Sequence, residues 1–371
     1  MQNHQSKSAA LRAKVLRRLG IERTSDIHQA YSFLETVELE GRRVKIAKWP
    51  TTRYHIYWPG WIKKPVTLLA NHVALLAQIL AGAAQGRVVI VREFTNWLFV
   101  LLVPFIFPLR RRVILNINDN LAPRLSGVSK VCFDVLRRLD FPVLLLDGGN
   151  VARALCERTG DMRLLTPYFA VPDRRAGRAT RGDPQRGFTV GFVGYFRHDK
   201  GGIEVLSEAV RRLVAEPGIA TAVGYWNRDQ IDALPGDVRE RVILRDTFDR
   251  VQYFDYLRSC HVIVVLAAEE FYQLRHSGVL VDAISCGTLA LCPAFPLFRY
   301  QVLHPVPVGA TYDSLSDLPL RVRALRDDYQ RLQGNFDRYF RLRAPEAVGA
   351  QMAEAWIAMQ ATTAAGRRSS R

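Results

Sequence analysis

The sequence has few cysteines, and their spacing gives no sign of a disulfide framework or a metal site. None of them forms a Cys-X-X-Cys pair, and the eight histidines also lack the spacing of metal ligands. We therefore expect reduced cysteines, packed inside the core, and no zinc module. The five cysteines are Cys132, Cys156, Cys260, Cys286 and Cys292.

Acidic residues are also scarce, with 35 Asp and Glu against 52 Lys and Arg, which gives a formal charge of +17. Such a charge attracts polyanions: nucleic acid, anionic lipid headgroups or a substrate that carries a diphosphate. Nucleic acid is the poorest match, because no zinc-ligand spacing, aromatic RNA-binding signature or helix-turn-helix is present. No Asp-X-Asp triplet occurs either. A bound diphosphate would therefore be neutralised by protein groups rather than by a carboxylate-held metal.

No apolar run is long enough to cross a bilayer, which takes roughly 20 residues, and no secretory signal is visible. The strongly apolar segment Trp97–Pro108 leads directly into Arg110, Arg111 and Arg112. Two interpretations stay open for it: a buried core helix, or a wedge that enters an anionic membrane interface. The basic, acid-free residues 7–19 suit the same interface or a solvated helix face. We expect a cytoplasmic protein, with the inner face of the cytoplasmic membrane as a site of peripheral attachment.

One segment of the second half combines a strand, a basic turn with glycines and an amphipathic helix without a gap. The β-branched and aromatic run Phe188–Val193 predicts the strand. Apolar residues then recur at helical spacing from Ile203 to Leu213. This succession is typical of phosphate-binding units in α/β proteins.

The turn inside this segment carries the residue types that bind a diphosphate. Glycines let the backbone come close to a ligand, cationic side chains offset its charge, and the first amides of the following helix point outward. The candidates are Gly191, Gly194, Arg197, Lys200, Gly201 and Gly202. We predict that a diphosphate binds here, with Arg197 and Lys200 taking up its charge.

Strands and helices alternate along the rest of the chain, which indicates parallel sheets. In the second half we expect strands at Val242–Leu244, His261–Leu266 and Thr288–Cys292, and a helix at Val279–Ser285 that ends at Gly287. In the first half we expect strands at Val44–Trp49, Arg87–Val91, Val113–Asn118, Phe141–Leu146 and Arg163–Thr166, with a long helix at Val66–Ala84. His261, at a strand start, is expected to be structural.

These motifs resemble the GT-B glycosyltransferases, and most closely their GT4-like group, which uses nucleotide-sugar donors. The segments Phe192-Val-Gly194, Lys200-Gly201 and Leu206-Ser-Glu-Ala209 match the opening of that family's donor domain. Ser277 to Thr288 matches the helix and glycine turn that follow further on. The resemblance implies an α/β fold with two Rossmann-like domains that face each other across a cleft.

The chain length agrees with two domains. We expect an acceptor-binding domain at 1–186 and a donor-binding domain at 187–344, because the Arg-, Gly- and Pro-rich residues 172–187 read as a linker. In the fold that the sequence resembles, the last helix crosses back to the first domain. Residues 345–371 would supply that helix, from Pro345 to about Ala361, and then a basic tail.

The resemblance also implies roles for single residues. Arg197 and Lys200 would bind the donor diphosphate, and Asp282 stands where the family has a Glu that holds the donor ribose. Arg275, with the amides of Ser277 and Gly278, would form a second clamp on the diphosphate. The remaining positions of the implied donor site are Gly194, Gly201, His276 and Glu270.

Two departures from the family pattern concern the donor sugar. In the family's register the glutamate partner of Asp282 would be Leu274, which cannot hydrogen-bond a sugar. Two alternatives stay open: Glu269, Glu270 or Arg275 takes over that role from a loop of altered length, or the donor sugar is held in a different way. The first-half strand ends at Asn118 and Asp119, where the family has a His and an Asp. An amide can donate to a sugar hydroxyl but cannot act as a general base.

The expected activity is transfer of a sugar from a nucleotide-sugar donor to an acceptor hydroxyl, with retained anomeric configuration and with no metal or other cofactor. An inverting enzyme would instead need a base, for which Asp119 and Glu93 are the candidates. A polyprenyl-diphosphate-linked glycan in bacterial surface polysaccharide or exopolysaccharide assembly is the expected acceptor. The alternatives are a soluble glycosyltransferase that acts on a small molecule and a non-catalytic GT-B-like binding or scaffold protein.

Overall fold

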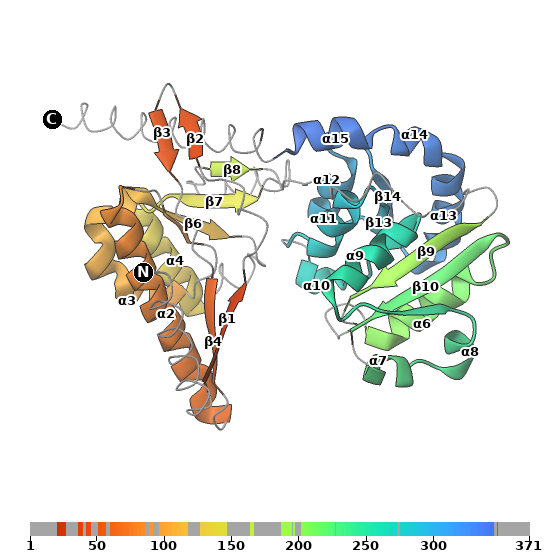
Figure 1. The fold of residues 1–371 in the computed structure, drawn as a ribbon, viewed down its shortest axis with the longest axis horizontal. Helices are drawn as coiled ribbons and strands as arrows, with labels where there is room; N and C mark the ends of the chain where they lie inside the picture. The colour runs from red at the N-terminus through yellow and green to blue at the C-terminus, as the bar shows by residue number, and fades with distance from the viewer. Residues whose placement is uncertain are drawn as a thin grey trace, which may run out of the picture.

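The helices and strands of the protein form an N-terminal group and a C-terminal group, each built around its own parallel sheet (Figure 1). The structure is a computed structural model of the 371-residue chain. It describes residues 21–26, 36–39, 42–45, 51–56, 60–86, 89–91, 96–117, 127–146, 164–166, 187–194, 196, 202–226, 228–272, 275–344 and 347.

The N-terminal sheet has four parallel strands in the order β5-β6-β7-β8, with a layer of helices packed against it. Its strands are β5 (Val89–Val91), β6 (Val113–Ile117), β7 (Val143–Leu146) and β8 (Leu164–Thr166), and its helices are α2 (Gly60–Ala84), α3 (Asn96–Ile106), the 3-10 helix η2 (Phe107–Arg112) and α4 (Gly127–Arg138). Fully buried side chains such as Phe99, Leu115 and Leu136 form the core between sheet and helices. The alternation predicted from the sequence is therefore confirmed in this half.

Two antiparallel pairs precede the N-terminal sheet. They are β1 (Ile21–Asp26) with β4 (Thr51–Ile56), and β2 (Thr36–Leu39) with β3 (Arg42–Lys45). The prediction of a parallel strand at Val44–Trp49 is wrong, because the described strand begins at Arg42, ends at Lys45 and pairs antiparallel with β2. Only Glu40 and Gly41 separate β2 from β3, and so short a connection makes the neighbouring strand the natural partner.

The C-terminal sheet has six strands, all parallel, in the order β11-β10-β9-β12-β13-β14. Taken in chain order, this is the 3-2-1-4-5-6 arrangement of a Rossmann fold. The strands are β9 (Phe188–Val193), β10 (Ile219–Tyr225), β11 (Ile243–Asp246), β12 (Val262–Val264), β13 (Leu289–Pro293) and β14 (Gly309–Tyr312). The predicted strand at Phe188–Val193 matches β9 at both ends.

Helices cover this sheet, and three of them lead to the candidate site. Those three are α6 (Gly202–Leu213), which follows β9, α9 (Arg250–Ser259), which follows β11, and α11 (Gly278–Ser285), which follows β12. The others are α7 (Arg228–Asp232), α8 (Gly236–Arg239), α10 (Glu269–Tyr272), α12 (Pro296–Leu303), the 3-10 helix η6 (Leu315–Asp317), α13 (Leu318–Asp327), α14 (Tyr329–Gln333) and α15 (Phe336–Leu342). The helix expected at Val279–Ser285 and the glycine stop after it are confirmed, since Gly287 has a φ of +67°.

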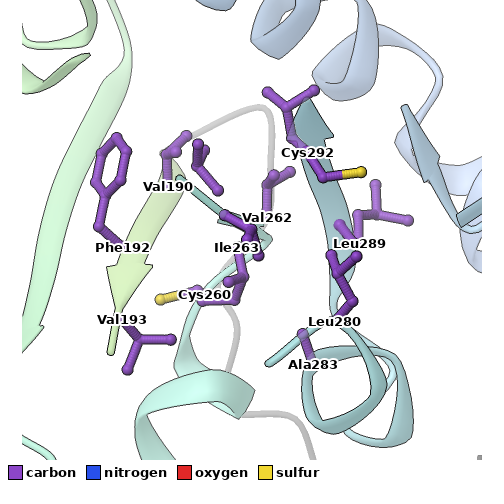
Figure 2. Packing of buried hydrophobic residues seen from close by; sticks show 14 of the residues in the cluster. Val190, Phe192, Val193, Cys260, Val262, Ile263, Leu280, Ala283, Leu289 and Cys292 are labelled. Atoms are coloured by element: carbon purple, nitrogen blue, oxygen red, sulfur yellow. The ribbon is translucent and has the colours of Figure 1, made fainter. Parts of the chain in front are cut away.

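Side chains from the central strands form the core of this domain, and Figure 2 shows Val190, Phe192, Val262 and Ile263 gathered there. Gly191 lies in the middle of β9. A Cβ at this position would lie 2.5 Å from Sγ of Cys260 and 2.8 Å from Cδ1 of Ile263. The missing side chain of Gly191 therefore makes room for core packing, and the prediction that this glycine admits a ligand is wrong.

The cysteine and histidine predictions agree with the structure where it describes them. Cys132, Cys260, Cys286 and Cys292 are free thiols; the last three are buried and Cys132 is half-buried. Nδ1 of His261 accepts a hydrogen bond of 3.0 Å from the backbone N–H of Thr189. The imidazole is thus a structural group that ties the start of β12 to β9. Cys156 lies outside the described residues.

The apolar segment Trp97–Pro108 is a core helix on one face only, and its interpretation as a membrane wedge stays a prediction. One face of α3 is core, with Phe99 and Ile106 fully buried, while Leu101 and Phe105 on the opposite face are exposed. Among the helices of the described residues, none is sufficiently long and apolar to span a membrane. The basic segment 7–19, the linker 172–186 and, except for residue 347, the predicted final helix lie outside the described residues, so the domain limits stay predictions.

Candidate functional site

The order of strands in the C-terminal sheet reverses between β9 and β12, its two central strands. From β9 the chain continues through α6 to β10 on one side, and from β12 it continues through α11 to β13 on the other. In open α/β sheets, ligands bind beside the carboxyl ends of the strands at such a switch point. Phe192 pairs in register with Val264, so the loops after β9 and β12 leave the sheet at the same edge. This edge is the candidate site.

The loop after β9 is described at its two ends. Gly194 has a φ of +127° and Gly202, the first residue of α6, has a φ of +72°. Both values lie in the left-handed region that glycine adopts without the cost met by other residues. The sequence-predicted order of strand, glycine turn and helix is therefore confirmed. Arg197, Lys200 and Gly201, which would bind the diphosphate, lie outside the described residues, and their roles stay predictions.

The loop after β12 carries the acidic and basic candidates for sugar recognition. Glu269 and Glu270 are exposed in the short helix α10, and Arg275 is half-buried just beyond it. The guanidinium carbon of Arg275 lies 5.1 Å from the centre of the Tyr272 ring, a cation–π contact that holds positive charge at this edge. No carboxylate within the described part of the chain forms an ion pair with Arg275. Leu274 lies outside that part.

Ser277 is locked into the fold by Gln301, a buried residue of α12. The backbone N–H of Ser277 donates to Oε1 of Gln301 at 2.9 Å, and Nε2 of Gln301 donates to the Ser277 carbonyl at 3.1 Å. Oγ of Ser277 accepts a hydrogen bond from the N–H of Leu280 and so caps α11. The predicted clamp is therefore wrong in one part, because the Ser277 amide is already used. The exposed Gly278 begins α11, one residue before the predicted start, and the role of its amide stays a prediction.

Asp282 lies one turn further along α11 and has a partner that the sequence did not suggest. The hydroxyl of Tyr253, on α9, donates to Oδ2 of Asp282 at 3.1 Å. Burial raises the pKa of Tyr253 well above its ordinary value, and the nearby Asp282 carboxylate raises it further. The phenol therefore stays protonated and keeps donating. His276, on the loop before α11, is half-buried.

An aromatic pair stands at the carboxyl ends of β10 and β11, and it was also missed from the sequence. Trp226 and Phe248 are both largely exposed, with ring centres 6.4 Å apart in an edge-to-face arrangement. Trp226 directly follows β10, and Phe248 comes two residues after β11, so a position just beyond a strand is the signal that the sequence offers. The exposed face of an aromatic ring at this edge suits a ligand with an aromatic ring of its own.

The N-terminal candidates Asn118 and Asp119 follow directly after β6, which ends at Ile117, and they lie outside the described residues. Whether they approach the donor edge stays a prediction. Within the described segments, no group of three His, Cys, Asp or Glu side chains is arranged to hold a metal ion.

Several solved structures share this architecture. Sucrose-phosphate synthase from Thermosynechococcus elongatus is similar with a TM-score of 0.56 and 17% identity, over 92% of this chain and 88% of that one. The α,α-trehalose 6-phosphate synthase from Burkholderia multivorans gives 0.52 and 13%, over 85% and 78%. HepE of Anabaena, in complex with UDP-glucose, gives 0.51 and 13%, over 83% and 85%.

The sequence itself gives no such match. No protein-family model matches it, and no curated protein is significantly similar to it. At the identities of the structural neighbours, the likeness defines a fold. The chain has the two-domain Rossmann-like fold of the GT-B glycosyltransferases, as the sequence motifs predicted.

Proposed function

We propose that the protein is a glycosyltransferase that uses a nucleotide-sugar donor. The observation that carries the proposal is the edge formed by β9 and β12, where a glycine-bounded loop, the start of α11 and the Asp282 carboxylate come together in a GT-B fold. The nearby Arg275 and the predicted pair Arg197 and Lys200 would neutralise the negative charge that develops on the leaving diphosphate. One of the structural neighbours, HepE, is described in complex with UDP-glucose.

Each part of the donor has a counterpart at this edge. A ribose has two hydroxyls that can donate to Asp282, whose carboxylate has lone pairs beyond the one used by Tyr253. The exposed rings of Trp226 and Phe248 offer a surface on which a nucleobase can stack. The sugar would lie near the exposed Glu269 and Glu270 of α10, in place of the family's missing glutamate.

The finer parts of the proposal rest on the resemblance and on surface character. Retained configuration follows from the GT4-like motifs, and a reaction without a metal follows from the lack of an Asp-X-Asp triplet. The acceptor would be a glycan on a polyprenyl diphosphate in surface polysaccharide assembly, since a formal charge of +17 favours polyanionic partners. The protein would act at the cytoplasmic face of the membrane.

A non-catalytic binding protein is the second candidate, because Leu274 and Asn118 stand where the family has a glutamate and a histidine. A soluble enzyme that glycosylates a small molecule is the third. Such an enzyme would have the same donor site but would not bind to lipid vesicles.

A thermal-shift titration with UDP, GDP, dTDP, CMP and their sugars tests the donor site. A ligand at a concentration of about 100 times its dissociation constant adds roughly 2.7 kcal/mol to the free energy of unfolding. The resulting rise in melting temperature is readily measured. We expect stabilisation by nucleotides of one base, weakened in Lys200→Ala and unchanged in Arg338→Ala, which removes an exposed cation of α15. No response to any nucleotide would contradict the transferase, and binding without sugar transfer to any acceptor would favour the scaffold.

A further inference from the structure

The outer face of α3 is apolar although it lies at the protein surface. Trp97, Leu101 and Phe105 recur at helical spacing on the face opposite the buried Phe99 and Ile106. Leu101 is 60% exposed and Phe105 is 64% exposed. Isolated exposed apolar residues are ordinary, but a continuous stripe of large ones is typical of a surface that contacts something other than water.

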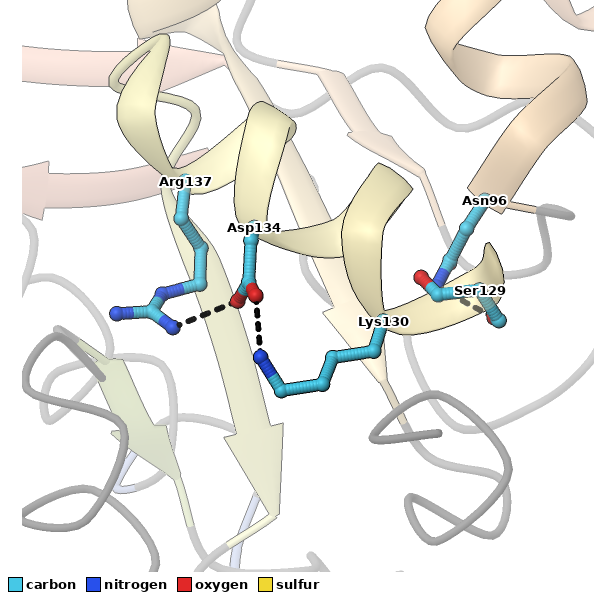
Figure 3. Close-up of polar contacts among 5 residues, drawn as sticks. All are labelled: Asn96, Ser129, Lys130, Asp134 and Arg137. Atoms are coloured by element: carbon cyan, nitrogen blue, oxygen red, sulfur yellow. Dashed lines mark hydrogen bonds and ion pairs between the residues drawn. The ribbon is translucent and has the colours of Figure 1, made fainter. Parts of the chain in front are cut away.

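The neighbouring helix α4 extends this stripe. Its residues Val128 and Val131 are 72% and 62% exposed, and α4 packs directly against α3. Nδ2 of Asn96 donates to both the carbonyl and the hydroxyl of Ser129 at 2.9 Å, which fixes the start of α3 against the start of α4 (Figure 3). We call the surface formed by Trp97, Leu101, Phe105, Val128 and Val131 the apolar face.

Positive charge borders the apolar face. Helix α3 and η2 contain no acidic residue, and η2 ends in Arg110, Arg111 and Arg112. The guanidinium carbon of Arg110 lies 4.2 Å from the centre of the Phe107 ring, so this cation stays beside the apolar stripe. Helix α2 also packs against α3 and likewise has no acidic residue. Its exposed Leu69 and Val73 add further apolar surface.

The single acidic residue of α4 does not cancel this charge. Asp134 accepts hydrogen bonds from Lys130 at 2.5 Å and from Arg137 at 3.1 Å, as Figure 3 shows. The hydrogen bond from Lys130 is the main reason why the pKa of Asp134 is lowered. The carboxylate is thus compensated on its own helix, and Arg112 and Arg138 remain exposed at the border of the face.

We propose that the apolar face is a docking surface for an anionic lipid bilayer. Large aromatic and aliphatic side chains would enter the headgroup region, and the bordering arginines would meet anionic headgroups. A protein partner would need acidic groups placed to match these arginines, whereas an anionic leaflet presents them everywhere. The biological purpose rests on the proposed function, because docking here would bring the enzyme to a lipid-linked acceptor. The physical docking does not depend on it.

Co-sedimentation of the full-length protein with vesicles tests this proposal. The probe is an equal mixture of phosphatidylglycerol and phosphatidylcholine, compared with phosphatidylcholine alone and with added salt. We expect binding to the anionic vesicles only. We expect Leu101→Asp to weaken this binding about tenfold or more, since a leucine that would enter the headgroup region is replaced by a negative charge. The double variant Arg110→Gln and Arg112→Gln should bind the anionic vesicles about fivefold more weakly for each arginine removed.

Leu320→Asp is a matched control, because Leu320 of α13 is a helical leucine that is also 60% exposed. It should bind vesicles as the wild type does. Equal binding by the Leu101 variant and the control would overturn the proposal. So would a stable dimer of the full-length protein that Leu101→Asp dissociates, without any vesicle binding.

Nucleotide-induced stabilisation is measured on the same preparations. If Leu101→Asp keeps the wild-type circular dichroism spectrum and still responds to nucleotide, both domains are folded, and its loss of vesicle binding is specific. A wild type that binds vesicles without any nucleotide response would contradict the proposed function alone. A wild type that responds to nucleotide but ignores anionic vesicles would contradict the docking surface alone.

Discussion

Tyr253 and Asp282 meet across two helices, with the tyrosine hydroxyl donating to the aspartate Oδ2 at 3.1 Å. The two residues are 29 positions apart, on α9 and α11. Aspartate is one methylene shorter than the glutamate that the GT4-like group has at this position. A fixed hydrogen bond at one oxygen restricts how the shorter carboxylate turns, and so Tyr253 is a positioning residue for Asp282.

Tyr253→Phe should therefore weaken nucleotide binding while leaving the fold intact. The hydrogen bond is made to a charged group, and its loss costs about 1.5–3 kcal/mol of the free energy of unfolding. The carboxylate of Asp282 would then turn more freely, and so we expect weaker nucleotide binding. Isothermal titration calorimetry with the stabilising nucleotide and its 2′-deoxy and 3′-deoxy forms measures the affinity for each form. In the wild type, the ribose forms should bind more tightly.

Asp282→Asn provides the comparison. Both variants should reduce the difference in affinity between the ribose and deoxyribose forms of the nucleotide. The double variant should bind the nucleotide no more weakly than Asp282→Asn alone. If Tyr253→Phe weakens all forms equally, the tyrosine acts on the fold and not on ribose recognition.

Gly191→Ala should destabilise the C-terminal domain. The new methyl group would meet Sγ of Cys260 at 2.5 Å and Oη of Tyr256 at 2.8 Å, and neither can move far inside the core. Overpacking of this kind costs about 1–3 kcal/mol of unfolding free energy. Urea denaturation followed by tyrosine and tryptophan fluorescence measures the change. Gly278→Ala is the control, because a Cβ there meets open space.

Trp226→Ala should reduce nucleotide affinity if the base stacks at the edge of β10. Stacking on an aromatic side chain is worth about 1–3 kcal/mol per base, so the expected loss is about fivefold or more. Phe105→Ala, which removes an exposed ring from the N-terminal group, should leave the affinity unchanged. Quenching of indole fluorescence on titration would report the contact directly. Unaltered affinity in the tryptophan variant would place the base elsewhere.

The sequence was sufficient for those elements that depend on local pattern. Phe188–Val193 is a dense β-branched and aromatic run, and its strand is found with both ends as predicted. Strand β10 was missed because Ala220, Ala222 and Gly224 give it little β-propensity. Gly224 is small for a packing reason, since a Cβ there would lie 2.8 Å from Cγ2 of Thr247. Such a requirement is set by another element and leaves no local signal.

The same distinction holds for the site. Gly194, Gly202 and Ser277 were named as candidates because a glycine turn and a helix start have recognisable patterns, and Asp282 was named from the resemblance to the GT4-like group; their roles stay predictions. The hydrogen bonds of Asp282 with Tyr253 and of Ser277 with Gln301 join separate helices and could not be read from spacing. Thus the sequence predicts where the candidate site lies in the sheet. The structure adds the hydrogen bonds that hold its side chains in place.

The paired hydrogen bonds between Ser277 and Gln301 have a consequence for binding thermodynamics. They involve only protein groups, and both residues are buried, so the start of α11 is ordered without any ligand. A flexible loop would lose conformational entropy each time a donor bound. Here that loss has already occurred during folding, and so the exposed first turn of α11 is preorganised for the proposed donor.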